Sequence, residues 1–319
     1  MSVDRFISGD WGTSRLRLRL VRQEPFEILE TVESDDGIAA VYDQWKDGSL
    51  SREKHFEAVL REQIGKFGES IESLPMILSG MASSAIGWRE LPYAPLPHRL
   101  SDPLPAEMVG AELDVRLISG LRFDSRDVMR GEETQVMGLW GNPSLGLPSR
   151  FRVLLPGTHS KHVVVENDTI TEFQTFLTGD LFQALGKHTI LKHSLDLEKP
   201  IKVDDSFREG VARIRDEPLD GALFGIRCAD LFNERQPAGN ASYLSGMLIG
   251  SEMKSMSKTS EPVVVAATPL GELYAEAVRV MGVGTRLLVV PEVALDEAVP
   301  RAHARLFGSS SQSYSQSLD

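Results

Sequence analysis

Two short segments of the chain place glycine next to hydroxyl-bearing residues in a way that suits phosphate binding. Residues 9–14 read GDWGTS, and residues 155–161 read LPGTHSK. Glycine lets a backbone approach a phosphate closely, and the N–H groups of a tight turn can converge on an anion. Either segment alone would also fit a plain β-hairpin turn. Because the Gly-Thr pattern occurs twice, the sequence favours two phosphate-binding loops.

Single side chains in these segments add specific chemistry. Asp10 is expected at the end of a strand, where one carboxylate can hold Mg²⁺ through bound water. The hydroxyls of Thr13 and Ser14 are further hydrogen-bond donors. His159 fits a loop donor better than a metal ligand, because no cluster of His, Cys or Asp surrounds it in the sequence. Lys161 fits either a phosphate contact or a solvated lysine on a strand.

A pair of acidic residues, Glu132 and Glu133, opens a predicted helix after Gly131. Phosphoryl transfer to a hydroxyl needs a carboxylate near the acceptor, and these residues are the first candidates. Acidic residues in a first helical turn also occur for electrostatic reasons alone, and that alternative stays open. Asp180 is the rival carboxylate, with a place at a helix N-terminus as its own alternative. Arg130 has a planar guanidinium that suits a bidentate contact with a substrate carboxylate.

The elements that must position these residues alternate between short apolar strands and helices. Strands are predicted at residues 3–8, 16–20, 26–32, 76–78, 115–118, 151–155, 161–165, 170–176, 262–266 and 287–290. Helices are predicted at residues 51–67, 131–140, 179–191, 219–233, 241–256 and 270–281. The order strand, Gly-Thr turn, strand, strand begins near residue 3 and again near residue 151. The sequence therefore predicts a duplicated, layered α/β chain.

The length of the chain indicates two domains. A chain of 319 residues exceeds the size at which a single core usually stops growing. Residues 141–149 read GNPSLGLPS and are the predicted junction, with an N-terminal domain at 1–140 and a C-terminal domain at 141–319. The end after about residue 308 is rich in Ser and Gln and is expected to fray.

Charge and cysteine content exclude several classes of function. The net charge of −12 argues against partners such as nucleic acid or an anionic membrane. Cys228 is the only cysteine, which excludes an intrachain disulfide and a cysteine-based metal site. The first residues lack a signal-peptide core, and no run approaches the roughly 18–20 apolar residues that span a bilayer. We therefore expect a cytoplasmic protein whose oligomeric state is open, a homodimer being one option.

Five segments together resemble the 2-dehydro-3-deoxygalactonokinase family, in the same order and spacing. They are DWGTSRLR at 10–17, SGMASSAIGWRELPY at 79–93, RGEETQ at 130–135, LPGTHSK at 155–161 and TFLTGDLF at 175–182. The two loops alone resemble only the wider group of sugar kinases, acetate kinase, actin and heat-shock ATPases. The resemblance extends from about residue 6 to about residue 307. It implies two duplicated actin-like (ribonuclease H-like) α/β domains with an ATP cleft between them.

The resemblance also implies what the chain binds and does. It implies transfer of the γ-phosphoryl group of ATP, with Mg²⁺, to the 6-hydroxyl of 2-dehydro-3-deoxy-D-galactonate or a related keto sugar acid. The positions that correspond to nucleotide binding are Asp10, Gly12, Thr13, Ser14, Arg17, Gly157, Thr158, His159, Lys161 and Pro269, with Asp10 also at the metal. The candidate substrate positions are Ser79, Gly80, Met81, Trp88 and Arg130. The candidate catalytic carboxylates are Glu132, Glu133 and Asp180. Trp88 and Tyr93 fit a substrate wall and a packed core equally well.

Two segments depart from the family pattern. Ala266 and Ala267 stand where related kinases usually have glycine, and their methyl groups could narrow the approach of the nucleotide. Residues 82–86 read ASSAI, where family members more often have glycine and a polar or basic residue. These departures leave two alternatives: a kinase of the same fold for a different hydroxy acid, and a non-catalytic regulator that binds ATP or sugar. A Rossmann dehydrogenase is excluded, because no G-x-G-x-x-G follows the first strand.

Overall fold

The computed structural model describes residues 4–68, 71–256, 261–266, 268 and 270–313, with side chains as far as Phe307. The chain divides into two compact units. Unit 1 comprises Met1–Leu147, Asp168–Ile170 and Val293–Asp319, and unit 2 comprises Pro148–Asn167 and Thr171–Glu292. The first crossing from unit 1 to unit 2 falls inside the predicted junction at 141–149, but the chain later returns to unit 1.

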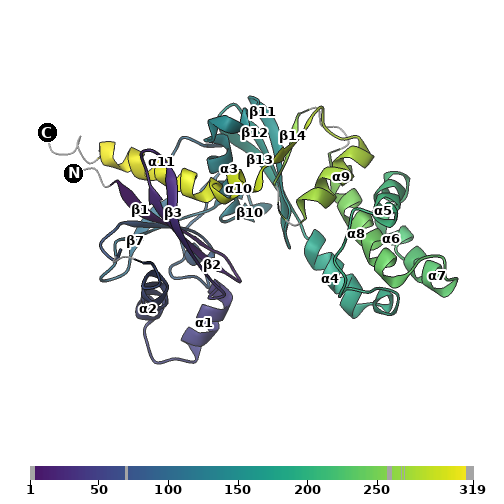
Figure 1. The fold of residues 1–319 in the computed structure, drawn as a ribbon, viewed down its shortest axis with the longest axis horizontal. Coiled ribbons are helices and arrows are strands. Elements are labelled where there is room, and N and C mark those ends of the chain that lie inside the picture. The colour runs from purple at the N-terminus through teal and green to yellow at the C-terminus, as the bar shows by residue number, and fades with distance from the viewer. Residues whose placement is uncertain (1–3, 69–70, 257–260, 267, 269, 314–319) are drawn as a thin grey trace. The chain divides into compact units, whose positions relative to one another are not determined.

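The described part of unit 1 is built on a six-stranded sheet with the order β3-β2-β1-β4-β8-β7. Its strands are β1 (Arg5–Trp11), β2 (Leu16–Arg22), β3 (Glu27–Ser34), β4 (Met76–Gly80), β7 (Ala106–Val109) and β8 (Val115–Ile118). β2 is antiparallel to β1, whereas β4 runs parallel to β1 and β8 parallel to β4. Helices α1 (Ile38–Lys46) and α2 (Arg52–Ile64) share one apolar core with this sheet (Figure 1).

The alternation of residues in β2 explains why this sheet has one apolar face and one charged face. Leu18 and Leu20 are buried in the core with α1 and α2. Arg17 and Arg19 point to the opposite face, because side chains alternate along a strand. Asp10 on β1 is paired with Arg17 in the register of the two strands, so it shares the charged face. This alternation thus places the carboxylate of Asp10 and the guanidinium groups of Arg17 and Arg19 on one side of the sheet.

The described part of unit 2 repeats this arrangement. Its sheet contains the order β15-β14-β11-β12-β13, formed by β11 (Arg150–Leu155), β12 (Ser160–Glu166), β13 (Thr169–Phe176), β14 (Val263–Ala266) and β15 (Leu287–Val290). β12 is antiparallel to β11, whereas β14 runs parallel to β11 and β15 parallel to β14. In each unit the first strand is central, the second and third lie on one side, and two parallel strands lie on the other. The predicted α/β fold class and its duplication are confirmed.

Helices make up the rest of unit 2 (Figure 1). They are α4 (Thr178–His188), the 3₁₀ helix η3 (Ile190–His193), α5 (Asp205–Asp216), α6 (Leu219–Ala222), α7 (Gly225–Leu231), α8 (Pro237–Lys254) and α9 (Gly271–Met281). α8 is the central helix, since α4, α5, α6, α7 and α9 all pack against it. The predicted helix at 219–233 is divided into α6 and α7, where Gly221 and Gly225 weaken the helix.

A small sheet in unit 1 leads the chain to α3 (Glu132–Trp140). Its order is β10-β9-β5, formed by β5 (Ala94–Pro95), β9 (Leu121–Phe123) and β10 (Asp127–Met129). The short strand β6 (His98–Arg99) pairs with Thr169 and Ile170, which also belong to unit 1. The remaining short elements are η1 (Met81–Ser83), η2 (Pro143–Leu145) and α10 (Glu292–Asp296). Because β10 ends just before Arg130, this sheet fixes where α3 begins.

The C-terminal helix α11 (Ala298–Ser313) packs on α3 and β1 of unit 1. Phe307 stacks on Phe6 of β1, with ring centroids 5.5 Å apart. Gly138 of α3 has no room for a Cβ, which would lie 1.7 Å from the carbonyl oxygen of Ala298. These contacts correct the prediction that residues 141–319 form one domain, because α11, as far as Phe307, packs on unit 1.

The helix α11 extends to Ser313, beyond the point near residue 308 where the sequence predicts a frayed tail. Residues 314–319 lie outside the described residues. In the part of the chain that the structure describes, no helix is long and apolar enough to cross a membrane.

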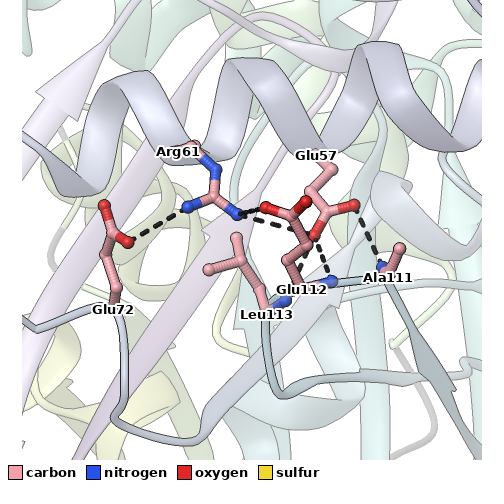
Figure 2. Close-up of polar contacts among 6 residues, drawn as sticks. All are labelled: Glu57, Arg61, Glu72, Ala111, Glu112 and Leu113. Atoms are coloured by element: carbon pink, nitrogen blue, oxygen red, sulfur yellow. Dashed lines mark hydrogen bonds and ion pairs between the residues drawn. The ribbon is translucent and has the colours of Figure 1, made fainter.

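A buried carboxylate ties helix α2 to the turn that precedes β8 (Figure 2). Glu57 accepts hydrogen bonds from the backbone N–H groups of Ala111, Glu112 and Leu113, at 3.0, 2.9 and 3.1 Å. Arg61, one helical turn further on, donates to the carboxylate of Glu112 at 2.9 Å. Burial raises the pKa of Glu57, but these backbone hydrogen bonds and Arg61 outweigh it and hold the pKa below its ordinary value. Glu57 therefore joins the α2 layer to the outer strands of the sheet.

Candidate functional site

The ends of β1 and β4 meet the start of α3 in unit 1. Gly80 ends β4 with a φ of +87°, and Gly131 precedes α3 with a φ of +108°. A Cβ on Gly131 would lie 3.2 Å from the Cα of Gly80, and a Cβ on Gly80 would lie 2.8 Å from the carbonyl oxygen of Trp11. Both positions need glycine, for the backbone angle and for the close approach. The approach brings the acidic start of α3 to the end of β1.

Asp10 is half-buried near the end of β1. In the register of the sheet it is opposite Arg17 on β2 and Ser79 on β4. Burial raises the pKa of Asp10. The charges of Arg17 and Arg19 lower this pKa and the charge of Glu132 raises it again, so the net shift is upward. A further cation beside Asp10 would therefore stabilise its ionised form.

The surroundings of Asp10 fit a magnesium ion held by one carboxylate and water. Its Oδ1 would lie 3.3 Å from a Cβ on Gly80, so the glycine leaves space beside the carboxylate. Magnesium typically takes one or two protein carboxylates and keeps several waters. Within the described residues, no group of three or more His, Cys, Asp or Glu side chains is placed to hold a metal. These oxygen donors suit Mg²⁺, and the assignment of the ion to Asp10 stays a prediction.

Glu132 and Glu133 have different surroundings. Glu133 is 1% exposed, and both of its oxygens accept the N–H of Gly131, at 2.8 and 2.9 Å. Burial, together with the charge of Glu132, raises the pKa of Glu133 to about 7. Glu132 is half-buried, accepts the backbone N–H of Arg130 at 2.9 Å, and acts electrostatically on Asp10. Glu132 is the more accessible carboxylate, whereas Glu133 holds the first turn of α3.

The first Gly-Thr turn is held by the start of helix α1. The N–H of Gly12 donates to the carbonyl of Arg15 at 2.9 Å. The N–H groups of Ile38 and Ala39 donate to carbonyl oxygens of the turn at 3.0 and 3.1 Å, and a Cβ on Gly37 would lie 2.2 Å from its backbone. The sequence prediction missed α1 and Gly37, although a glycine followed by apolar residues three apart was a usable signal. The predicted phosphate-binding residues of this turn and the next strand are half-buried or exposed: Gly12, Thr13, Ser14 and Arg17.

The predicted substrate residues fall into two groups. Ser79 and Gly80 lie at the end of β4, and Met81 follows them as the half-buried first residue of η1. Trp88 lies in the core of unit 1, where it is 1% exposed and its indole N–H donates to Glu53 at 2.6 Å. Of the two roles that the sequence leaves open for Trp88, the structure shows core packing.

Arg130 is buried, and its guanidinium is engaged by the segment after β4. Nη1 donates to the carbonyl and hydroxyl oxygens of Ser83, and Nη2 donates to the carbonyl of Leu91. Nε donates to the hydroxyl of Tyr93 at 3.3 Å, and the guanidinium lies 4.0 Å from the centre of the same ring. These contacts support a role of Arg130 in shaping residues 83–93, which contain the predicted substrate position Trp88. A direct contact between Arg130 and a substrate carboxylate stays a prediction.

The second Gly-Thr turn joins β11 and β12 in unit 2. A Cβ on Gly157 would meet no described atom within 4 Å, so this turn is open to a ligand. The carbonyl of Thr158 accepts the N–H groups of Gly179 and Asp180 at 3.1 and 3.3 Å, which binds the start of α4 to the turn. His159 Nε2 and Asp180 Oδ2 are 2.6 Å apart, with both side chains about half exposed. The structure thus pairs the rival carboxylate with the histidine of the turn.

A cavity of about 360 Å³ lies beside this turn, within unit 2. Its lining includes Gly157 and Thr158 of the turn and the apolar side chains of Leu248, Ile249 and Leu270. Small-molecule sites commonly have a volume of this order and combine apolar walls with a few polar groups. The combination suits a nucleotide whose base is buried and whose phosphates reach the turn.

Of the two remaining residues predicted to bind the nucleotide, the structure describes Lys161 but not Pro269. Lys161 on β12 is 6% exposed, which excludes a solvated strand lysine, and its contact with a phosphate stays a prediction. Pro269 and the neighbouring Ala267 lie outside the described residues. Ala266 is buried at the end of β14, and a Cβ on Gly271 would lie 2.5 Å from its carbonyl oxygen. The start of α9 therefore packs closely against the end of β14, at Gly271 and Ala266.

The two sheets of the same strand order, each with a Gly-Thr turn between its first two strands, define the actin-like ATPase and sugar kinase class of folds. Within this class, the chain belongs to the 2-keto-3-deoxy-galactonokinase family, whose model it matches over residues 10–298. The family that the sequence motifs predict is confirmed.

Named relatives agree with this family. A protein of Rhizobium meliloti (strain 1021), named as a probable 2-dehydro-3-deoxygalactonokinase, is 32% identical over 307 residues, which cover 91% of this chain and 92% of that protein. The 2-dehydro-3-deoxygalactonokinase of Escherichia coli (strain K12) is 29% identical over 286 residues, or 87% of this chain and 90% of that protein. A crystal structure of a Sinorhizobium meliloti protein assigned the same activity has a TM-score of 0.80 at 29% identity, with 94% and 95% of the two chains covered.

Proposed function

We propose that the protein is an ATP-dependent kinase that phosphorylates the 6-hydroxyl of 2-dehydro-3-deoxy-D-galactonate or a closely related keto sugar acid. The family match and the names of the relatives support this reaction. One structural observation carries the proposal: the close contact of Gly80 with Gly131 sets Glu132 near Asp10. Phosphoryl transfer to an alcohol requires one carboxylate for the acceptor hydroxyl and one for the metal.

In this proposal Glu132 accepts the proton of the acceptor hydroxyl. Its half-buried carboxylate is more accessible than that of Glu133, which is 1% exposed and occupied with the N–H of Gly131. Glu133 acts through α3, by fixing the turn that carries Glu132. Asp180 remains the rival base, but its carboxylate is engaged by His159 at 2.6 Å.

The residues that we assign to the nucleotide belong to both units. Asp10 would hold Mg²⁺ through water, and the ion would neutralise phosphate charge during transfer. The turns at residues 12–14 and 157–161 would bind phosphates through backbone N–H groups and hydroxyls. The cavity of about 360 Å³ in unit 2 would hold the nucleoside. The apolar lining of this cavity and the open position at Gly157 fit this division.

The acceptor carries a carboxylate at one end and a primary hydroxyl at the other. We assign its carboxylate to backbone donors of the segment that follows β4, which Arg130 holds in shape. We assign its 6-hydroxyl to Glu132. A neutral hexose would leave the carboxylate-binding donors unpaired, which costs about 1–3 kcal/mol for a buried polar group and more for a charged one.

A coupled ADP-release assay with Mg·ATP tests the proposal. The substrates are a panel of 2-keto-3-deoxy sugar acids, with galactose and glucose as neutral controls. We expect kcat/KM to be at least about 100-fold higher for 2-dehydro-3-deoxy-D-galactonate than for either hexose. Preference for a different hydroxy acid would support the alternative that residues 82–86 suggest. Binding of ATP without turnover of any acid would support the non-catalytic regulator.

A further inference from the structure

A buried carboxylate on helix α8 gathers hydrogen bonds from several segments of unit 2. Glu252 is 2% exposed. Its Oε1 accepts from the hydroxyl of Ser160 at 2.6 Å and from Nε2 of His162 at 2.7 Å. Its Oε2 accepts from the hydroxyl of Thr178 at 2.5 Å and from that of Tyr274 at 2.8 Å. Each carboxylate oxygen thus has a pair of donors among the described side chains.

The partners of Glu252 come from the elements that surround the cavity of unit 2. Ser160 begins β12, directly after the second Gly-Thr turn, and Thr178 is the first residue of α4. Tyr274 lies in the first turn of α9, and both it and Thr178 line the cavity. Ser160 is fully buried and lies outside the cavity lining. Through one carboxylate, the turn, α4 and α9 are held to α8.

Helix α8, which carries Glu252, also lines the cavity. Its residues Ser245, Leu248 and Ile249 line the cavity, and Glu252 follows them at the next helical position of that stripe. Residues spaced three, four and seven apart share one face of a helix. The carboxylate therefore lies at the end of the cavity-lining face of α8, where β12, α4 and α9 come together.

The chemistry of Glu252 makes this junction sensitive to a single atom. An ionised carboxylate accepts hydrogen bonds at both oxygens, whereas an amide replaces one acceptor with a donor. A buried carboxylate is costly unless such donors compensate it. Glu252→Gln would therefore turn an –NH₂ group towards two of the present donors. The amide would fit only if the hydroxyls of Thr178 and Tyr274 turned from donating to accepting, and the charge that the four donors share would be lost.

We propose that Glu252 is a positioning residue for the nucleotide: it holds the second Gly-Thr turn, the start of α4 and the start of α9 in the arrangement that binds ATP. The inference rests on the proposed function, because it takes the cavity of unit 2 as the nucleotide site. The start of α4 contacts the second Gly-Thr turn directly, since the N–H groups of Gly179 and Asp180 donate to the carbonyl of Thr158. A shift at Thr178 is therefore passed to the backbone that faces the phosphates.

The test compares Glu252→Gln with Glu261→Gln in the full-length protein. Glu261 is also buried in unit 2, but it is paired with Arg152 and does not line the cavity. Affinity for Mg·ADP is measured by calorimetry, the KM values for ATP and for the keto acid by ADP release, and folding by thermal unfolding. We expect Glu252→Gln to weaken Mg·ADP binding and to raise the KM for ATP at least tenfold, with the KM for the keto acid changed less than threefold. Glu261→Gln should lower thermal stability while leaving nucleotide affinity unchanged.

A milder variant keeps the test decisive if Glu252→Gln does not fold. Ser160→Ala removes one donor to Glu252 without touching the cavity lining, and it should weaken Mg·ADP binding at least threefold. If the folded variants kept wild-type affinity for Mg·ADP, or lost nucleotide and keto-acid binding equally, the positioning role would be overturned while the proposed function stood. If wild-type protein bound Mg·ADP but phosphorylated no acid, the kinase function would fail and the Mg·ADP comparison would still decide the role of Glu252. Wild-type protein that bound no Mg·ADP would overturn both.

Discussion

Glu132 and Glu133 are neighbours in the chain, but burial gives them different chemistry. Glu132→Gln is expected to lower kcat by about 10²–10⁴-fold, which is the usual contribution of a positioned general base. The KM for ATP should change little, because Glu132 is assigned to the acceptor hydroxyl and the cavity proposed for the nucleoside lies in unit 2. Steady-state ADP-release kinetics measure both values. Glu90→Gln, at an exposed position of unit 1, is the control. Wild-type kcat in Glu132→Gln would move the base assignment to Glu133 or Asp180.

The raised pKa of Glu133 predicts an acid limb in the pH profile. With a pKa of about 7, Glu133 is ionised only above neutral pH, and the ionised form is the stronger acceptor for the N–H of Gly131. Wild-type kcat/KM is therefore expected to fall as the pH drops below about 7. This limb should be absent in Glu133→Gln, whose side chain does not titrate. The same limb in both proteins would assign it to another group.

The raised pKa of Glu133 also has a stability consequence of definite sign. An unfolded glutamate has a pKa of about 4.3. Between about pH 4.3 and 7 the folded protein therefore binds a proton that the unfolded chain releases. The contribution of Glu133 to stability is full below that window and is lost as the pH rises through it. Urea unfolding of Glu133→Gln should accordingly show a relative gain over wild type from pH 5 to pH 8.

Residue types in the site were readable from the sequence, but their surroundings were not. The Gly-Thr turns, Asp10 and the Glu pair follow from spacing and from the chemistry of phosphate transfer. The burial of Trp88 does not, since tryptophan suits a ligand wall and a core equally well. Glu252 carries no local signal at all, because its donors come from three separate elements, β12, α4 and α9.

At the scale of elements, short apolar runs were predictive, whereas one amphipathic helix and the strands of two residues were missed. β8 and β15 have the predicted bounds, because each is a short, mainly apolar run flanked by polar residues or proline. α5 was missed, although Asp204 caps it by accepting the N–H of Phe207 at 2.8 Å and its apolar residues have helical spacing. The two-residue strands β5 and β6 owe their existence to tertiary pairing and have no pattern of their own.

The junction of α2 with the turn before β8 supports a stability prediction (Figure 2). Glu57→Gln replaces a carboxylate that accepts backbone N–H groups of residues 111–113 with an amide that can accept at one end only. Hydrogen bonds to a charged group contribute about 1.5–3 kcal/mol. We expect a loss of about 2 kcal/mol in the free energy of unfolding at pH 7. Urea denaturation measures it, and Glu62→Gln on the exposed face of the same helix is the control.

The pH dependence of this loss has a definite sign. The pKa of Glu57 is lower in the folded protein than in the unfolded chain, where it is about 4.3. Its contribution is therefore fully present above that value and is lost as the pH falls through the folded pKa. The difference between wild type and Glu57→Gln should shrink at acid pH. A difference that stayed constant down to pH 3 would mean that packing, not charge, accounts for the loss.

At the scale of the whole molecule, the C-terminal helix contributes a buried titratable group to unit 1. His303 of α11 is 0% exposed, and its Nδ1 lies 2.8 Å from the hydroxyl of Ser8 on β1. Its Nε2 has no hydrogen-bond partner within the described residues. Burial lowers the pKa of His303 to about 3. No local pattern predicts this contact, since Ser8 and His303 lie near opposite ends of the chain.

The buried histidine makes the fold of unit 1 sensitive to acid. An unfolded histidine has a pKa of about 6.5, so between about pH 6.5 and 3 the unfolded chain binds a proton that the folded protein does not. Stability must then fall with pH in this window, by up to about 1.4 kcal/mol per pH unit from this group. Burial lowers the pKa of His98 and His162 as well, so the total slope contains their contributions. The contribution of His303 therefore has to be isolated by a variant.

His303→Gln keeps a polar side chain opposite Ser8 and does not titrate. At pH 7.5 it is expected to be less stable than wild type, because the core around α11 repacks imperfectly. As the pH falls from 6.5 towards 4, the free energy of unfolding should decrease less steeply in the variant, so the two curves converge. His188→Gln, at an exposed position of α4, should leave the wild-type pH dependence unchanged. Parallel curves for wild type and His303→Gln would show that the α11 contact does not couple protonation to the folding of unit 1. Convergence would mean that protonation of His303 in α11 contributes to the loss of stability of unit 1 in acid.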